Sequence, residues 1–422
     1  MSGTRFKLYP QPGFLENFGE PETVHISSPA GSIGPGPSDR RIYTVYPVGK
    51  PTPYGIDPSP QQRPNISLPP WRGEILPPAE PDAQGHFDYL KPGTPQFEAA
   101  HLFGTVRFVL DIWERYFGRK IPWHFAPRYD QLELTIQPTL NNAQAGFGFI
   151  EVGTDLKNGT SQPFSLNFDI IAHEFGHILL FSELGLPDPA LSRGEYWGFH
   201  ESGADLVALI SSLHFNSVVD ELLVRTRGNL YMFNVLNRMG ELSPEGQIRN
   251  AANDIRLSQF VRGWEDEHFL AQPLTGAFFD IFVDIFHEKL LDHGLIGPEV
   301  EDLSDRLLAT PEYAPIMQGL FDQAFDRNPD GFKEALLLTR DTLGTYLADT
   351  WSRLNADYLN YIDVAEAFEE VDREFSGGRY KRLIRGNFYM RDIGSVRVGP
   401  QLAPFGKNSH VNSVRTLAPR SV

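Results

Sequence analysis

The feature that most constrains this chain is the pentad His-Glu-Phe-Gly-His at residues 173–177, which lies inside an apolar run over residues 170–181. The run predicts a buried helix, with Asn167 as its cap and Asp169 in the first turn, where a negative charge is favoured. Residues four apart share one face of a helix, so both imidazoles can reach one metal ion. Glu174 projects beside them, where it can take a proton from water. Zinc uses such an arrangement when one coordination position stays open.

Gly176 is unusual in the middle of this predicted helix, because glycine costs about 1 kcal/mol relative to alanine there. We therefore expect another backbone to pass close to it. The alternative interpretation of the pentad is a structural helix with two satisfied histidines and a surface glutamate. A histidine pair in apolar surroundings needs a metal or hydrogen-bond partners, since lone buried polar groups are costly.

A zinc site of this kind needs a third protein ligand, and residues 198–205 offer one. Glu201 and Asp205 are four apart and lead into the apolar run 206–210, so on a helix they share a face. A carboxylate ligand at Glu201, with Asp205 holding a histidine ring by its far nitrogen, is physically sensible. Two acids on a solvated face are the alternative, which the apolar residues that follow make less attractive.

The order of these motifs resembles that of the gluzincin metallopeptidases, specifically the thermolysin-like group. That family has a long helix, strands, an edge strand that begins Asn-Ala, a turn, and then two helices that carry the pentad and a Glu-x-x-x-Asp motif. The resemblance covers about residues 95–210 and is looser beyond. The matching segments are a helix over 97–117, a strand over 131–137, the edge strand from Asn142 and Ala143, and its partner over 149–153.

The resemblance implies an α+β fold of two lobes, a mixed β/α N-terminal lobe with the active-site helix and a mainly α-helical C-terminal lobe. It implies a zinc cofactor held by His173, His177 and Glu201. Glu174 would be the general base, and Asp205 would orient His173. The implied activity is that of a hydrolase, a zinc metalloprotease that cleaves a peptide or protein substrate through a metal-activated water.

Two departures from the family pattern stand close to the ligands. The family has Asn directly before the ligand glutamate, whereas this chain has His200, which would either replace that asparagine as a donor or compete for the metal. The family also carries a tyrosine upstream that helps to stabilise the oxyanion. Tyr196 is the candidate here, at a shorter spacing and in the predicted loop.

Further site residues are implied by the resemblance alone. His268, ahead of an apolar helix, would donate to the oxyanion, with Asp266 or Glu267 orienting it; an exposed histidine among acids is the alternative. Arg256 would contact a substrate carbonyl, with Arg249 and Arg262 as competitors and a surface charge as the alternative. The substrate would pair antiparallel with the edge strand at Asn142 and Ala143.

The composition changes along the chain and suggests four regions. Residues 1–95 are rich in Pro and Gly and predict an extended arm with short strands near 24–26 and 42–46. Two other interpretations of this region stay open: a pro-segment that is removed by cleavage, and an arm that covers the cleft of a latent peptidase. Residues 96–205 would form the N-terminal lobe, 206–394 the helical lobe, and 395–422 a loose tail. Helices are expected at 202–214, 217–236, 275–291, 311–325, 331–354 and 361–375.

Charge and composition narrow the partners and the location. The 422 residues carry a net charge of −17, which argues against nucleic acid or an anionic membrane as a partner. Cysteine is absent, so thiolate metal sites and disulfides are excluded. We find no stretch that approaches a transmembrane span and no signal-like apolar core, and expect a cytoplasmic protein, with non-classical export as the alternative. The oligomeric state stays open.

A rival function belongs to another class. The chain would be a catalytically inactive, zinc-stabilised binding or scaffold protein of the same fold. The glutamate at position 174 argues against this reading, because a purely structural metal site needs no base.

Overall fold

The computed structural model describes residues 3–57, 65–155, 162–192, 194–231, 236, 238–243, 246–260, 266–300 and 313–394. The fold is mixed α+β. Its strands are β1 (Gly3–Leu8), β2 (Glu22–Pro29), β3 (Ile42–Val45), β4 (Gly55–Asp57), β5 (Asn65–Ser67), β6 (Leu132–Ile136), β7 (Ala143–Gly146), β8 (Phe149–Val152), β9 (Thr154–Asp155), β10 (Gln162–Pro163), β11 (Arg238–Ser243) and β12 (Gly246–Asn250). Its longer helices are α1 (Pro95–Tyr116), α2 (Phe168–Leu184), α3 (Gly194–Ser212), α4 (Asn216–Thr226), α5 (Glu267–Asp292), α7 (Ala314–Arg327), α8 (Pro329–Arg353), α9 (Tyr361–Ser376) and α10 (Lys381–Met390).

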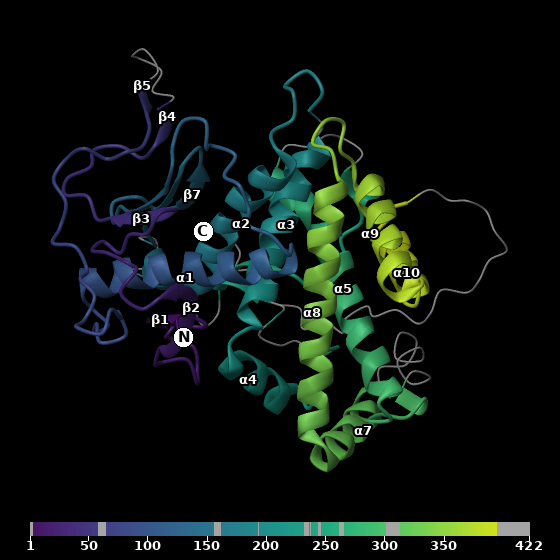
Figure 1. Ribbon diagram of the computed structural model, residues 1–422. Coiled ribbons are helices and arrows are strands. Elements are labelled where there is room, and N and C mark those ends of the chain that lie inside the picture. The colour runs from purple at the N-terminus through teal and green to yellow at the C-terminus, as the bar shows by residue number, and fades with distance from the viewer. Residues whose placement is uncertain are drawn as a thin grey trace, which may run out of the picture.

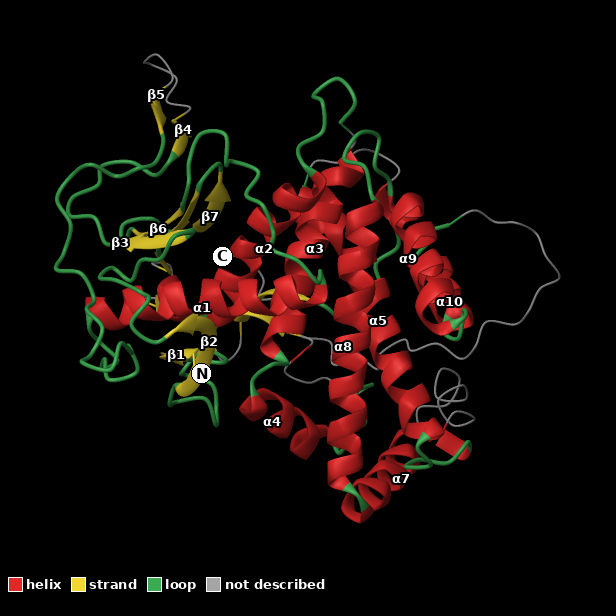
Figure 2. Cartoon of the chain, in the orientation of Figure 1, coloured by secondary structure: helices red, strands yellow, loops and turns green. Residues whose placement is uncertain are grey.

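Strands and helices are unevenly distributed (Figures 1 and 2). The strands β1 to β8 lie with α1 on one side of the molecule, and α5, α8, α9 and α10 form its other side, with α2 and α3 between them. The largest sheet has four strands in the order β3-β6-β8-β7. β3, β6 and β8 run parallel, whereas β7 pairs antiparallel with β8 and lies at the sheet edge. The expected edge strand and its partner are therefore confirmed.

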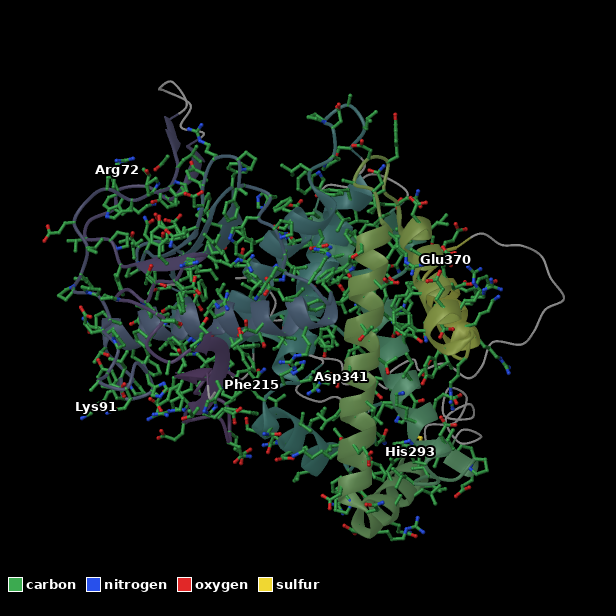
Figure 3. The ribbon with its side chains drawn as sticks, viewed as in Figure 1. Arg72, Lys91, Phe215, His293, Asp341 and Glu370 are labelled. Atoms are coloured by element: carbon green, nitrogen blue, oxygen red, sulfur yellow. The ribbon has the colours of Figure 1, made fainter. Side chains whose placement is uncertain are left out.

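The two sides of the molecule are joined by buried aromatic and polar contacts. Trp113 of α1 stacks on Trp351 of α8, with ring centroids 4.9 Å apart. Nearby, the Tyr116 hydroxyl lies 2.9 Å from Nε2 of His214 and donates to Asp341 of α8 at 2.9 Å; Asp341 is labelled in Figure 3. These contacts fix α8 against α1.

The helix that carries the pentad forms for the local reasons that its sequence indicates. The Asn167 side chain caps α2 by accepting from the Ile170 amide at 3.2 Å, and Asp169 lies in the first turn. The helix ends at Gly185, whose φ of 79° favours glycine. A Cβ on Gly176 would meet Cα of Ala204 at 2.7 Å. The expected close backbone approach is confirmed, and α3 is the helix that makes it.

The N-terminal region supplies part of the main sheet, because β3 pairs with β6. Alternate residues of a strand point to opposite faces of a sheet. On one face of β6, Leu134 joins the apolar core, and on the other, Glu133 accepts from Tyr54 and from the Trp71 amide. The described parts of the segment around Tyr54 and Trp71 thus cover the second face of the sheet. β1 and β2 pair with each other, and β1 was not expected from the sequence.

A cluster of ionisable and polar side chains lies under this covering segment and is named here the arm cluster: Lys50, Tyr54, Glu133, Gln137 and Glu151. Nζ of Lys50 lies 2.6 Å from Oε1 of Glu151, with both side chains almost fully buried. The Tyr54 hydroxyl donates to Glu133 at 2.6 Å. The arm cluster ties the N-terminal region to β6 and β8.

The helical part differs from expectation at several boundaries. α3 begins at Gly194, eight residues before the expected start, and α4 ends at Thr226, where Arg227 takes a left-handed φ of 55°. The hairpin of β11 and β12 follows where no strand was expected. α5 begins at Glu267, because Asp266 caps it, and it continues through Pro273. α10 was not expected, and residues 301–312 and the tail 395–422 lie outside the described residues.

One helix corrects the expectation that no stretch approaches a membrane span. Within the described residues, α5 has the length and composition of such a span, with a mean hydropathy of 1.4 over its most apolar window, and 83% of that window is buried. α3 and α4 pass the same test only as a pair bent by 90°. A core helix of a globular protein gives the same signal, so this is weak support for a membrane segment.

Candidate metal centre

Two neighbouring helices bring three possible metal ligands together. Nε2 of His173 and Nε2 of His177 lie 3.1 Å apart on one face of α2. The Glu201 carboxylate of α3 lies 3.4 Å from the first nitrogen and 3.5 Å from the second. One ligand atom from each of these residues lies within 4.8 Å of the others. The α2–α3 contact at Gly176 is what allows side chains of both helices to reach one point.

This donor set fits a divalent metal ion. Two imidazole nitrogens and one carboxylate are a ligand set that catalytic zinc sites use. The lining of the surrounding cleft also fits a cation, because its described residues include the four carboxylates of Asp169, Glu174, Glu201 and Asp205 and neither Lys nor Arg. The three-residue group is therefore a possible metal site.

Each histidine of the pair has a partner at its other ring nitrogen. Nδ1 of His173 lies 3.0 Å from Oδ1 of Asp205, which is the contact expected of a residue that orients this ring. Nδ1 of His177 lies 2.8 Å from Nδ1 of His200, and the two rings stack with centroids 5.0 Å apart. Both contacts hold the Nε2 atoms toward Glu201.

The contact with His200 fixes which ring donates when the centre binds a metal. A nitrogen that binds a metal must carry a lone pair, so His177 must then hold its proton on Nδ1 and donate it. His200 would then be the acceptor, whereas the sequence suggested either a donor or a competitor for the metal. Burial, followed by the nearby His177, holds the pKa of His200 well below its usual value, so this ring is neutral. Its Nε2 has no partner among the described residues.

The three residues lie at a cleft of about 350 Å³ between α2 and β7. Glu174 lines this cleft beside His173. The other wall is the edge strand with Asn142 just before it. The described lining consists of Asn142, Ala143, Gln144, Ala145, Phe164, Asp169, Ile170, His173, Glu174, His177, Glu201, Asp205 and His268.

His268 reaches the same cleft from the start of α5. Its Nε2 lies 3.6 Å from the Glu201 carboxylate, and its Nδ1 lies 3.3 Å from Oδ1 of Asp266. Asp266 also caps α5 by accepting from the His268 and Phe269 amides. Of the two acids considered from the sequence, Asp266 is the one placed to orient this half-exposed ring.

The structure does not bring Tyr196 or Arg256 to the cleft. Because α3 begins earlier than expected, Tyr196 lies in the helix and packs into the core, where its hydroxyl donates to the Gly185 carbonyl at 2.7 Å and burial raises its pKa. Arg256 is half-exposed, with Nη1 4.0 Å from the Asp392 carboxylate. Of its competitors, Arg249 belongs to β12, and Arg262 lies outside the described residues.

Some lining residues were missed at the sequence level. Asp169 and Ile170 were seen only as a helix-start residue and an apolar residue. Asp169 is four residues before His173, and Ile170 is four before Glu174, so the same helical rule could have placed both in the cleft. Gln144 and Ala145, in contrast, belong to the edge strand that was expected to pair with the substrate. Phe164 lies in a short 3₁₀ turn before α2, and no local signal marks it.

Comparison with known proteins adds little to this description. No protein-family model matches the chain, and no curated protein matches it. One solved structure similar to it is the precursor of protealysin, a metalloproteinase from Serratia proteamaculans, at 10% identity and a TM-score of 0.46, covering 76% of this chain and 84% of that chain. A likeness this weak carries no argument, so the functional conclusion rests on the residues of the cleft.

Proposed function

We propose that this chain is a zinc-dependent peptidase with a gluzincin-like, two-lobed fold, which hydrolyses peptide bonds in the cleft between α2 and β7. One observation supports the proposal most directly. His173, His177 and Glu201 converge from two helices on one point of a cleft that Glu174 also lines. A purely structural zinc site is normally closed by four protein ligands and needs no such carboxylate beside them.

In the proposed enzyme, His173, His177 and Glu201 would hold the zinc ion. A zinc ion held in this way polarises a peptide carbonyl and lowers the pKa of a water molecule. Asp205 would hold the His173 ring, and His200 would hold the His177 ring in the tautomer that leaves Nε2 free of a proton. Because these partners fix both rings, the ligands need little reorganisation.

Glu174 would act as the general base. Its carboxylate takes a proton from the attacking water and then delivers that proton to the leaving amine. His268, oriented by Asp266, would donate a hydrogen bond to the carbonyl oxygen as this oxygen gains negative charge. The Glu201 contact supports this role, because it places the His268 ring over the same point of the cleft.

The substrate would bind as an additional strand. β7 pairs with β8 along one edge and is the outermost strand of the sheet order. An extended peptide can therefore pair with the free edge of β7 through main-chain hydrogen bonds. Asn142 and Ala143 lie where the C-terminal part of an antiparallel peptide would pass.

A test measures bound metal and hydrolysis in the same samples. We expect about one zinc per wild-type chain, hydrolysis of labelled casein that a chelator abolishes and zinc restores, and loss of both zinc and hydrolysis in Glu201→Ala. Glu370→Ala is a matched control, since Glu370 is an exposed glutamate of α9 (Figure 3). Hydrolysis that survives complete removal of metal would overturn the proposal.

The same experiment separates the rival function. A zinc-stabilised binding or scaffold protein would hold zinc through the same three residues and hydrolyse no substrate under any condition. Stoichiometric zinc without hydrolysis, over a broad set of peptides, would replace the peptidase proposal by this alternative.

A further inference from the structure

The face of α2 that carries the metal ligands continues beyond them with an aromatic ring. Asp169, His173 and His177 line the cleft at four-residue steps, and Phe181 is the next residue at that spacing. Phe181 is half-buried, and its ring centroid lies 4.1 Å from that of His200. The ring of His200 stacks on His177. The apolar surface therefore begins directly beside a proposed metal ligand.

The opposite wall of the cleft continues with aromatic rings at the same end. Phe147 follows the last residue of β7 and is 38% exposed. The ring of Phe147 lies 5.5 Å from that of His124, which in turn lies 5.4 Å from Phe181. The end of β7 and the end of this α2 face thus meet through three rings.

The third element at this end is α3. Trp197 is four residues before Glu201, so the two side chains lie on neighbouring turns of one helical face. Its ring lies 6.4 Å from His200, and the residue is 41% exposed. Phe147, His124, Phe181, His200 and Trp197 form a chain of neighbouring rings, called here the aromatic row. Its two outer members, Phe147 and Trp197, are exposed.

The end of the cleft near Asn142 differs in its side chains from the end near Phe147. The Asn142 carbonyl accepts from the Gly153 amide, and the Phe164 amide donates to the Gly153 carbonyl, so Asn142 and Phe164 lie close together. Asp169 also lines this end of the cleft, and its carboxylate accepts from Gln11 at 3.3 Å. One end of the cleft thus carries an additional carboxylate, whereas the aromatic row lies beyond the other end.

The strand direction decides which part of a substrate meets the aromatic row. β7 runs from Ala143 to Gly146, so an antiparallel peptide runs from Gly146 toward Ala143. The residues before the scissile bond then lie at the end of β7 that leads to Phe147. The residues after it pass Asn142 and Asp169.

We propose that the aromatic row binds a bulky apolar side chain, aromatic in particular, on the N-terminal side of the scissile bond. This inference rests on the proposed peptidase function. Two large rings left exposed beside a concave site favour an apolar partner, because covering them removes apolar surface from water and aromatic pairs add a further attraction. The occupant is the substrate itself, since the row continues the walls of the cleft in which it would bind.

Cleavage-site profiling on a complex peptide mixture tests the inference. For the wild type, we expect Phe, Tyr, Trp or Leu to be enriched within the three residues before the cut. The Trp197→Ala and Phe147→Ala variants should lose this enrichment, and Trp197→Phe should keep most of it. Tyr389→Ala is the matched control, because Tyr389 is an exposed aromatic residue on α10.

A pair of synthetic peptides sharpens the result. The peptides differ only by Phe or Gly before the scissile bond. For the Phe peptide, Trp197→Ala should raise KM about 10-fold with kcat nearly unchanged, as expected when a contact that is equal in the ground and transition states is lost. For the Gly peptide, Trp197→Ala should change neither constant. Circular dichroism and zinc content must match the wild type in each variant.

The failures of the two proposals are distinguishable. A wild type that holds zinc and hydrolyses peptides without enrichment before the cut would overturn the aromatic-row inference and leave the peptidase proposal intact. Enrichment that persists in both alanine variants would do the same. A wild type that hydrolyses no peptide would overturn the proposed function, and the inference with it.

Discussion

Two clusters of buried ionisable side chains, the arm cluster on the main sheet and the candidate metal centre on α2 and α3, compensate their carboxylates in different ways. In the arm cluster, Lys50 neutralises Glu151, and the Tyr54 hydroxyl and the Trp71 amide donate to Glu133. In this cluster, groups of the chain itself compensate both carboxylates, one with a cation and the other with neutral hydrogen-bond donors. Buried carboxylates require such compensation, because an uncompensated buried charge is very costly.

The metal centre is built from acceptors and anions. The described lining of its cleft carries four carboxylates and neither Lys nor Arg. In the proposed enzyme, a bound metal ion would supply here the positive charge that Lys50 supplies in the arm cluster. The comparison teaches that burial alone does not mark a functional site. The cleft differs from the arm cluster because its described lining gathers carboxylates and imidazoles at an open surface without Lys or Arg.

Deletion of residues 1–94 should have the largest effect, since it removes β3 and two of the five members of the arm cluster, Lys50 and Tyr54. We expect a chain that fails to fold, because the second face of β6 and β8 loses its cover and Glu151 loses Lys50. Circular dichroism and solubility measure the outcome. A soluble, folded and more active fragment would instead support a latent peptidase whose arm covers the cleft.

Glu174→Gln should lower kcat by about 10²–10⁴-fold, because an amide cannot take the proton that the base accepts. Zinc content should stay at the wild-type level, since Glu174 is not one of the three converging residues. Steady-state hydrolysis and elemental analysis on one sample give both values. Retained hydrolysis would remove Glu174 from the mechanism.

Lys50→Met should destabilise the fold by about 3–5 kcal/mol, because it leaves the Glu151 carboxylate buried without its cation. Urea unfolding measures the change, and Lys91→Met is the control, since Lys91 is exposed (Figure 3). The folded variant should bind zinc as the wild type does. A loss below 1 kcal/mol would show that the arm cluster does not depend on this pair.

His200→Leu should weaken zinc binding by about 10–100-fold, because His177 loses the acceptor that fixes its tautomer. His200→Asn should restore much of the affinity, since its side-chain carbonyl can accept the same proton. Competition with a chromogenic chelator measures both. Equal affinity in the Leu and Asn variants would show that His200 only fills space.

The smallest expected change in stability comes from His287, a buried ionisable residue outside both clusters. Burial lowers the pKa of His287 to about 3, below its usual value. Near pH 6.5, the unfolded chain therefore binds a proton at this residue, whereas the folded chain does not. The stability from this residue is complete above that pH and is lost as the pH falls.

From pH 7 to pH 5, this residue should contribute a loss of about 2 kcal/mol, which His287→Phe should remove. Urea unfolding of both proteins at the two pH values measures the difference. Equal slopes against pH in the two proteins would contradict the assignment.

Local spacing explains why much of the metal centre could be predicted. The His173–His177 spacing places both rings on one helical face wherever that helix lies. The cap at Asn167 and the close approach at Gly176 are also local consequences of residue type, and both are found. The start of the edge strand at Asn142 and Ala143 was within one residue of the observed β7.

Non-local contacts explain what could not be predicted. Whether Tyr196 reached the cleft depended on where α3 begins, and its hydroxyl is bound to Gly185 instead. The role of His200 as an acceptor depends on its stacking against His177. The pairing of β3 with β6 and the burial of Lys50 join residues about ninety to one hundred positions apart, for which no local pattern exists.

The sequence by itself determined the chemistry that this protein can offer: two imidazoles at helical spacing, a carboxylate beside them and acids on a following helix. Only the tertiary structure decided which of these groups converge on one point, that Tyr196 and Arg256 lie outside the cleft, and which aromatic rings gather beside His177. The physical reason is the distance along the chain over which each effect acts. Helical periodicity acts over four residues, whereas convergence and burial depend on packing between segments that are distant in the chain.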